Sequence, residues 1–189
     1  MDTLEWIAAG LGLANVGLLV RRSVWNYPFG IAMVALYFFV FRDAKLYSDM
    51  GLQVFFLVIQ LYGWWSWLRA RAGDGVVRVG VLTPHGRLLW AAGAVAAGVV
   101  WGLGMARLTD AAAPVPDALI AAMSVAAQIL LALRRVENWV LWIAVDLLAV
   151  GLYASRGLYA TAALYAVFLV MAAAGLVEWR RALAVRAAA

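Results

Sequence analysis

Residues 137–181 read ENWVLWIAVDLLAVGLYASRGLYATAALYAVFLVMAAAGLVEWRR, and this stretch decides the fold class. It holds two long apolar runs, Asn138–Ser155 and Gly157–Val177, whose one charged residue is Asp146. At about 1.5 Å per residue, each run can cross roughly 30 Å of hydrocarbon as a helix. Neither run alternates apolar with polar residues, as membrane strands do. Two adjacent transmembrane helices are therefore predicted.

The whole chain has the composition of an integral membrane protein. Of its 189 residues 67% are hydrophobic and 13% are charged, whereas a soluble domain carries about 25% charged residues. This composition excludes a soluble enzyme and a disordered chain, and the absence of cysteine excludes a disulfide scaffold. The first residues are acidic and no cleavage site follows, so we interpret them as a retained first span, not a signal peptide.

Seven charge-poor windows predict seven transmembrane helices in one all-α domain. The windows are Trp6–Val20, Ser23–Phe41, Met50–Leu68, Leu88–Ala106, Ala118–Leu133, Asn138–Ser155 and Gly157–Val177. Asn26 and Asn138 open two of these helices, and we expect them to act as N-caps. The Gly-rich segment between Arg69 and Arg87 is expected to be a loop that could hold a small hairpin.

The basic residues predict the orientation, because cytoplasmic loops concentrate Lys and Arg. With seven spans, eleven of the fifteen basic residues fall on one side, and only Arg42, Lys45, Arg107 and Arg156 fall on the other. This places the N-terminus outside and the C-terminus in the cytoplasm. The net charge of +5 is thereby explained by topology and not by a nucleic-acid surface.

The chain matches itself when it is shifted by 112 residues. Matching pairs include arginines, asparagines, aromatic residues and glycines: Arg22 and Arg134, Asn26 and Asn138, Phe56 and Phe168, Gly63 and Gly175, Trp67 and Trp179. Coincidence between apolar sequences explains matched Leu and Ala but not these. We predict a duplication with repeat one at about 3–69, a linker helix at about 87–107 and repeat two at about 117–181. Three spans per repeat and one extra span give a parallel 3+1+3 bundle, as in SWEET-type transporters.

The sixth span carries the clearest candidate binding face. Trp139, Trp142, Asp146 and Tyr153 share one side of the helix at 100° per residue. Two indoles could stack on a flat ring while the carboxylate accepts hydrogen bonds. The alternative is that Asp146 ties helices together and that the Trp residues are interfacial anchors.

The third and seventh spans carry matching candidates. Gln53, Gln60 and Trp64 share one face of the third span, and the seventh offers Tyr165 and Phe168. An amide can both donate to and accept from a substrate, although Gln60 could instead bond a neighbouring helix. The counterparts of Asp146 and Gln60 at the 112-residue shift are Val34 and Ala172, so the polar equipment is asymmetric.

No cofactor, metal or energy-coupling motif is expected. His85 is the one histidine and is interpreted as a solvated loop residue, since a metal site needs at least three protein ligands. The phosphate-binding pattern of ATP-driven transporters does not occur in the sequence.

Three segments resemble the PnuC family of bacterial vitamin transporters: WNYPFGI (25–31), QLYGWWSW (60–67) and residues 137–181 quoted above. The resemblance implies a SWEET-like bundle in the bacterial inner membrane that takes up nicotinamide riboside by facilitated diffusion. Related proteins carry thiamine, riboflavin or nucleosides. The family is thought to depend on a cytoplasmic kinase that traps the substrate as a phosphate.

Carried over to this chain, the resemblance implicates Gln60, Trp64, Trp139, Trp142 and Asp146 in substrate binding. Many members carry Asn where this chain has Asp146, which bears on which vitamin is bound. Other classes fit less well. A membrane enzyme would need an acid–base pair or nucleophile that the spans do not offer, and a structural or assembly protein would not need matched polar and aromatic faces. A homo-oligomer is left open.

The orientation can be tested with reporter fusions. A fusion at residue 189 should report a cytoplasmic location, and one in the loop between Arg42 and Asp49 should report an external one. An external C-terminus would contradict the seven-span count.

Overall fold

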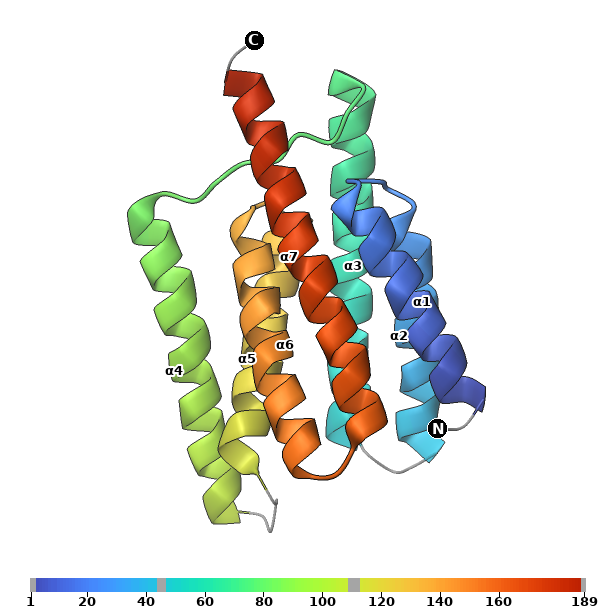
Figure 1. Cartoon of the computed structure of the whole chain (residues 1–189), viewed down its shortest axis with the longest axis vertical. Coiled ribbons are helices and arrows are strands. Elements are labelled where there is room, and N and C mark those ends of the chain that lie inside the picture. Colours follow the sequence, from blue (N-terminus) through green and yellow to red (C-terminus); the bar gives the residue numbers. More distant parts are fainter. Residues whose placement is uncertain (1–2, 44–46, 109–112, 188–189) are drawn as a thin grey trace.

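The computed structural model describes residues 3–43, 47–108 and 113–187, and within them it is all-helical (Figure 1). The helices are α1 (Thr3–Val20), α2 (Asn26–Asp43), α3 (Tyr47–Asp74), α4 (Pro84–Leu108), α5 (Pro114–Ala132), α6 (Glu137–Ser155) and α7 (Tyr159–Ala187). The expectation of an all-α chain is confirmed.

Four of these helices are long and apolar enough to cross a membrane: α4, α5, α6 and the Tyr159–Val185 part of α7. The apolar parts of α1 and α2 are shorter, at Trp6–Val20 and Asn26–Phe39. Helix α3 has 28 residues and is therefore about 40 Å long. Four spans are thus supported directly, and the count of seven stays a prediction.

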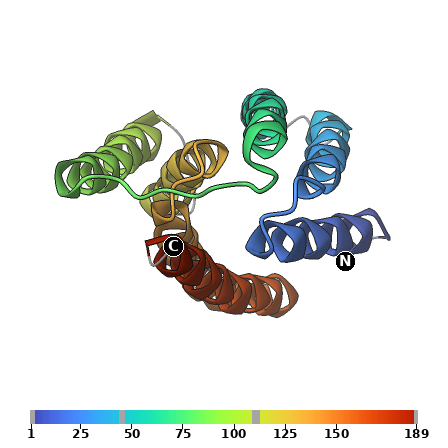
Figure 2. The same ribbon diagram turned by 90° about the horizontal axis from the view of Figure 1, so that it is seen from above.

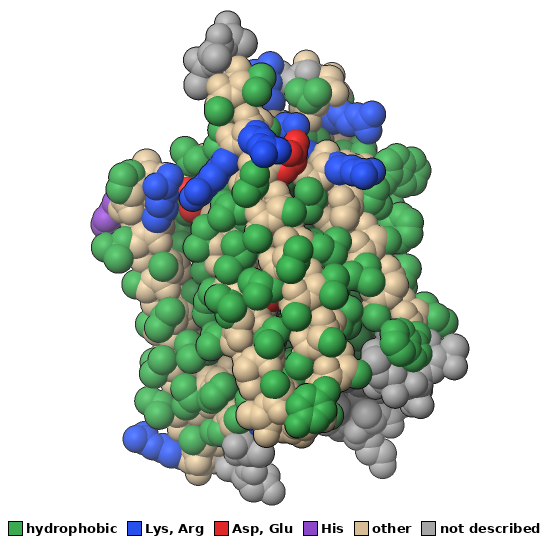
Figure 3. All heavy atoms as spheres, viewed as in Figure 1, with side chains coloured by type: hydrophobic (Ala, Val, Ile, Leu, Met, Phe, Trp, Pro, Cys, Tyr) green, Lys and Arg blue, Asp and Glu red, His purple; other side chains and the backbone are tan. Residues whose placement is uncertain are grey.

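The helices form two groups of three with α4 outside them (Figures 1 and 2). In the first group α2 packs on both α1 and α3, and in the second α6 packs on both α5 and α7. The groups meet where α1 contacts α7 and where α3 contacts α5. On the face shown in Figure 3, most of the Lys and Arg side chains gather at the end of the molecule where α7 ends, while apolar side chains cover the flank.

Helices α1 and α5 end in the same way. Arg22 and Arg134 follow them with positive φ angles of 55° and 58°, a conformation that usually favours glycine. The amide of Arg22 donates to the carbonyl of Leu19 at 2.9 Å, and that of Arg134 donates to Leu131 at 2.8 Å. Both turns therefore reverse the chain sharply enough to start the next helix within a few residues.

The two asparagines after these turns do not act as expected. The Asn26 side-chain amide donates to the Ser23 carbonyl at 2.7 Å, and the Asn138 amide donates to the Arg135 carbonyl at 2.6 Å. An N-cap side chain would instead accept from a helical N–H group. The N-cap prediction is therefore wrong. Both side chains stabilise the preceding turn, because each donates a second hydrogen bond to a carbonyl that already accepts the backbone amide of the same asparagine.

A buried aromatic cluster joins the two groups. The Trp67 indole donates to the Leu131 carbonyl of α5 at 3.4 Å, and the Trp179 indole donates to the Leu19 carbonyl of α1 at 3.3 Å. The two indole rings lie 5.9 Å apart, and both are 0% exposed. Each indole thus donates a second hydrogen bond to a carbonyl at the end of a helix in the opposite group, which also accepts the amide of the arginine after that helix.

Two further aromatic rings pack edge-on against this pair, and each lies against a glycine of a neighbouring helix. Tyr27 lies 5.4 Å from Trp67, and Trp139 lies 5.6 Å from Trp179. A Cβ atom on Gly63 would come within 2.6 Å of Tyr27, and one on Gly175 within 2.5 Å of Trp139. The rings of Tyr27 and Trp139 can pack directly on the backbones of α3 and α7 only because these helices have glycine at the contact positions.

Helix α4 is seated on α5 through glycines. A Cβ on Gly98 would lie 2.8 Å from the Cα of Leu119, and one on Gly102 would lie 2.6 Å from the Cα of Val115. Small residues one turn apart let two backbones approach closely, which favours helix association in lipid.

The segment between α3 and α4 is a loop, as expected, but it does not form the hairpin that we considered. Gly80 forms an isolated parallel bridge with Arg135. Glu137 accepts from the Leu82 amide at 3.1 Å and pairs with Arg87 at 2.8 Å. The segment is fastened to the turn between α5 and α6, and Val77 and Val79 are buried there. His85 is exposed in the first turn of α4.

We expect Gly175→Ala to lower stability, because the new methyl group would collide with the rigid Trp139 ring. Overpacking of this kind costs about 1–3 kcal/mol, which thermal unfolding of the detergent-solubilised protein would register as a lower Tm. Gly151→Ala in α6 is the matched control, since nothing lies within 4 Å of its Cβ position. Equal melting of the two variants would contradict the packing assignment.

Candidate functional site

Gln60 and Asp146 lie at the same depth in the bundle. Gln60 precedes Trp67 by seven residues on α3, and Asp146 follows Trp139 by seven residues on α6. Trp67 and Trp139 both belong to the aromatic cluster. Helix α3 runs toward the cluster from Gln60 to Trp67, and α6 runs away from it from Trp139 to Asp146. Each polar residue is therefore about 10 Å from the cluster, on its far side from the arginine-rich end. Both are buried, at 5% and 4% exposure.

Gln60 occupies space that Gly30 leaves open. A Cβ atom on Gly30 would collide with the Gln60 side-chain oxygen and lie 2.7 Å from the Asn15 side-chain nitrogen. Three helices of the first group therefore meet at two amides and a bare backbone. Asn15 is held in turn by donating to the Asn26 carbonyl at 2.7 Å.

Two tryptophans of the predicted site border the same apolar cluster. Trp64 of α3 and Trp142 of α6 are half-buried and pack against the core that surrounds Trp67 and Trp179. Trp142 also packs against the second core, around Leu130 and Val145 of α5 and α6. An indole from each helix group thus lies between the aromatic cluster and the level of Gln60 and Asp146.

Trp139 is more buried than Trp64 and Trp142. It is 1% exposed, and its ring fills the space above Gly175 against Trp179. Its indole N–H is buried and donates to no partner within the described residues. This position gives Trp139 a packing role in the structure, next to Trp142 on the same helix.

Asp146 interacts with Tyr165, which belongs to a group of tyrosines from three helices. The Tyr165 hydroxyl of α7 interacts electrostatically with Asp146 and with Tyr37 of α2, and it is hydrogen-bonded to Tyr153 of α6. The Tyr165 ring lies 5.3 Å from that of Tyr153 and 6.0 Å from that of Phe168. Tyr165 is thus a phenol group near Asp146 that could donate a hydrogen bond to a carboxylate, and Tyr37 and Tyr153 interact with Tyr165 in turn.

Phe168 and Gln53 complete the predicted set. The Phe168 ring closes the aromatic group on the α1 side, where a Cβ on Gly12 would lie 3.1 Å from it. Gln53 is half-buried on α3, seven residues before Gln60, and nothing in the structure brings it to the tyrosines. The structure therefore assembles two clusters: Asn15, Gly30 and Gln60 in the first helix group, and Asp146, Tyr153, Tyr165 and Phe168 in the second, with Tyr37 reaching across from α2.

Tyr37 and Asn15 are the residues that sequence reasoning missed or set aside. Tyr37 follows Val34, the counterpart of Asp146, by three residues, so a search for polar groups near the counterpart of each candidate would have found it. Asn15 is not among the sequence candidates, because its proximity to Gln60 depends on how α1 is rotated about its axis.

The described residues hold no group of three or more His, Cys, Asp or Glu that could bind a metal ion. Two cavities lie away from the polar clusters. One of about 590 Å³ opens between α1 and α7, and one of about 260 Å³ is enclosed by the α3–α4 segment, α4, α5, α6 and α7. Gln60 and Asp146 are shielded from solvent in this conformation.

Comparison with known proteins identifies relatives along nearly the whole chain. Residues 2–181 match the family described as nicotinamide mononucleotide transporter. The nicotinamide riboside transporter PnuC of Escherichia coli is 29% identical, over 93% of this chain and 85% of its own length. The riboflavin/roseoflavin transporter RibM of Streptomyces davaonensis is 30% identical, over 89% of this chain and 80% of its own.

A solved structure has the same fold. The crystal structure of the vitamin B3 transporter PnuC superposes with a TM-score of 0.76 at 28% identity, covering 95% of this chain and 81% of that one.

Proposed function

Because the chain belongs to the nicotinamide mononucleotide transporter family, we propose that it carries nicotinamide riboside into the cell by facilitated diffusion. Membership makes it a multi-pass transporter of the bacterial inner membrane and places it in a family of transporters, not of enzymes. The proposed substrate is supported by one observation: both the sequence and the fold of the chain are similar to those of PnuC transporters over more than nine-tenths of its length.

We propose a parallel 3+1+3 bundle with the N-terminus outside and the C-terminus in the cytoplasm. Equivalent contacts made by residues whose numbers differ by 112 support the duplication. These are the turns at the two arginines, the side-chain hydrogen bonds of the two asparagines and the hydrogen bonds of the two indoles. The contact of α1 with α7 likewise recurs as that of α5 with α3. The arginine-rich end (Figure 3) supports the orientation.

The substrate site is proposed to lie between the helix groups, at the level of Gln60 and Asp146. Trp64 and Trp142 would stack on the nicotinamide ring, while the Gln60 amide and the Asp146 carboxylate would bind the carboxamide and ribose hydroxyls. Tyr165 and Phe168 would hold Asp146 in place, Trp139 would support Trp142, and Gln53 would lie toward the external end. Both helix groups are needed, which suits one asymmetric ligand.

Net uptake through such a site needs a sink for the substrate. Phosphorylation by a cytoplasmic kinase would keep the free vitamin low inside and the gradient inward, without an energy source in the transporter itself. Closed packing around Gln60 and Asp146 requires that the helix groups move relative to each other during transport. Association into a homo-oligomer would leave each bundle with its own site.

The test is counterflow of labelled vitamin in proteoliposomes that contain this chain alone. Nicotinamide riboside should exchange faster than riboflavin, thiamine or a deoxynucleoside. Riboflavin is the second candidate because RibM is 30% identical to this chain. Faster exchange of riboflavin would overturn the proposed substrate, and no exchange of any compound would overturn the transport function.

Trp142→Ala connects this activity to the site. Stacking on an aromatic side chain contributes about 1–3 kcal/mol, so the half-saturating riboside concentration should rise about tenfold or more. Trp101→Ala is the matched control, since Trp101 lies on α4 and is 66% exposed. Equal effects of the two substitutions would remove Trp142 from the site.

Asp146 separates hydrogen bonding from proton coupling. As a hydrogen-bonding ligand it should tolerate Asn, which keeps an acceptor of similar shape, but not Leu. Asp146→Asn should therefore keep measurable counterflow while Asp146→Leu loses it, and Asp117→Asn at an exposed ion pair with Arg156 is the control. Uphill accumulation that a protonophore abolishes and that Asp146→Asn lacks would contradict facilitated diffusion.

A further inference from the structure

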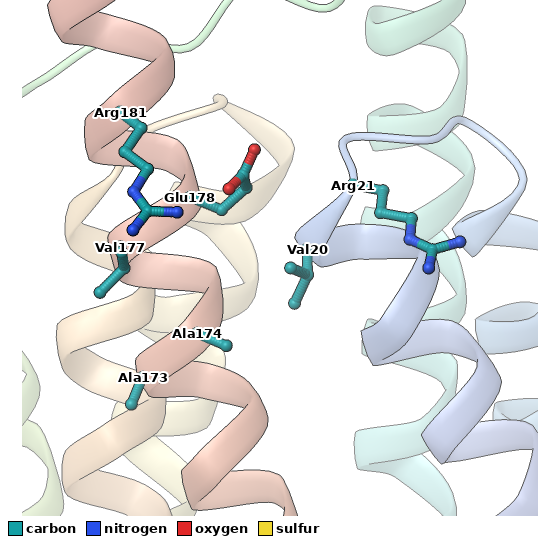
Figure 4. A pocket seen from close by; sticks show the side chains of 7 residues that line it. All are labelled: Val20, Arg21, Ala173, Ala174, Val177, Glu178 and Arg181. Carbon is teal, nitrogen blue, oxygen red and sulfur yellow. The ribbon is translucent and has the colours of Figure 1, made fainter.

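An open groove separates α1 from α7 at the arginine-rich end of the molecule. It has a volume of about 590 Å³ and is lined by Val20, Arg21, Ala173, Ala174, Val177, Glu178 and Arg181. Figure 4 shows the two walls, with Val20 and Arg21 at the end of α1 and the other five residues along α7. Its size lies in the range of small-molecule sites, about 300–1,000 Å³.

The lining is divided by chemistry along the helix axis. Ala173, Ala174 and Val177 form an apolar wall on α7 toward the middle of the bundle. Arg181, one turn further along α7, and Arg21 on the opposite wall carry the positive charge, and both are exposed. Two arginines and Glu178 leave the rim with a net positive charge. This arrangement of an apolar part next to a positively charged rim is complementary to a phospholipid, whose apolar acyl chain is attached next to a negatively charged phosphate.

The counterpart positions in the other helix group are built differently. At the shift of 112 residues, Ala174 and Val177 correspond to Tyr62 and Trp65, and Arg21 corresponds to Leu133. The rings of Tyr62 and Trp65 contact each other with centroids 6.0 Å apart, and the guanidinium of Arg69, the counterpart of Arg181, lies 4.7 Å above Trp65. Large rings thus stand at the positions where α7 carries small residues.

We propose that the α1–α7 groove binds a phosphatidylglycerol-type phospholipid of the cytoplasmic leaflet. The phosphate accepts hydrogen bonds from Arg181, since guanidinium groups pair well with phosphate oxygens. Arg21, whose side chain extends away from α7 in Figure 4, adds positive charge from the opposite wall. The glycerol hydroxyls of the headgroup donate to Glu178, and an acyl chain lies along Ala173, Ala174 and Val177. Basic pockets between membrane helices on the cytoplasmic side are typical binding places for anionic headgroups.

The site is distinct from the proposed vitamin site. The leaflet follows from the proposed orientation, but the groove and its charges do not depend on which vitamin is carried. Lipid binding can therefore be measured on the whole chain without any transport assay.

The experiment is native mass spectrometry of the purified chain in detergent, with phosphatidylglycerol or phosphatidylcholine of identical acyl chains added. Wild-type protein should retain more phosphatidylglycerol. Arg21→Ala and Arg181→Ala should each reduce those adducts about fivefold. Ala174→Tyr combined with Val177→Trp copies the counterpart positions and should block binding while both arginines remain.

Arg69→Ala is the matched control, because it removes the counterpart arginine at a position without the groove. It should leave the phosphatidylglycerol adducts unchanged. Equal retention of the two lipids by wild-type protein, or unchanged adducts in the double variant Arg21→Ala with Arg181→Ala, would overturn the proposal. Displacement of the lipid by inorganic phosphate would also overturn it, since that would indicate an anion site without an acyl slot.

Discussion

Two reciprocal hydrogen bonds hold the bundle together. The indoles of Trp67 and Trp179 each donate to a carbonyl at the end of a helix in the opposite group. In a bilayer, lipid chains are as apolar as leucine, so helix association depends on close packing and on bonds of this kind. The same carbonyls accept the amides of Arg22 and Arg134, so the indole bonds and the sharp turns after α1 and α5 rely on the same atoms.

The position of the candidate site follows from this cluster. Tyr27 and Trp139 pack on the two indoles over Gly63 and Gly175, which sets the rotation and depth of α2, α3, α6 and α7. Gln60 and Asp146 then fall at one level, about two turns from the cluster. The residues around the cluster recur at a shift of 112 positions, whereas the polar residues two turns away from it do not, so a similar framework can present different polar side chains.

Side chains at several pairs of positions 112 residues apart differ in size or polarity. Gly30 leaves room for the Gln60 amide, whereas its counterpart Trp142 offers an indole. Val34 is a buried apolar residue, whereas its counterpart is Asp146. Small residues on α7 leave a groove where α3 carries Tyr62 and Trp65. In each case one position packs against a neighbouring helix, and its counterpart differs in size or polarity.

The sequence by itself determined the helical class, the membrane environment and the pairs of residues 112 positions apart, because hydropathy, charge and self-similarity are properties of the chain alone. Trp67 and Trp179 could be matched in this way, but the carbonyls they bind could not. Only the tertiary structure decided that Tyr37 and Asp146 both interact with Tyr165, that Asn15 lies beside Gln60 and that Glu137 fastens the α3–α4 segment. These contacts join residues on different helices. They depend on the rotation and crossing of packed helices, which the period of a single helix does not specify.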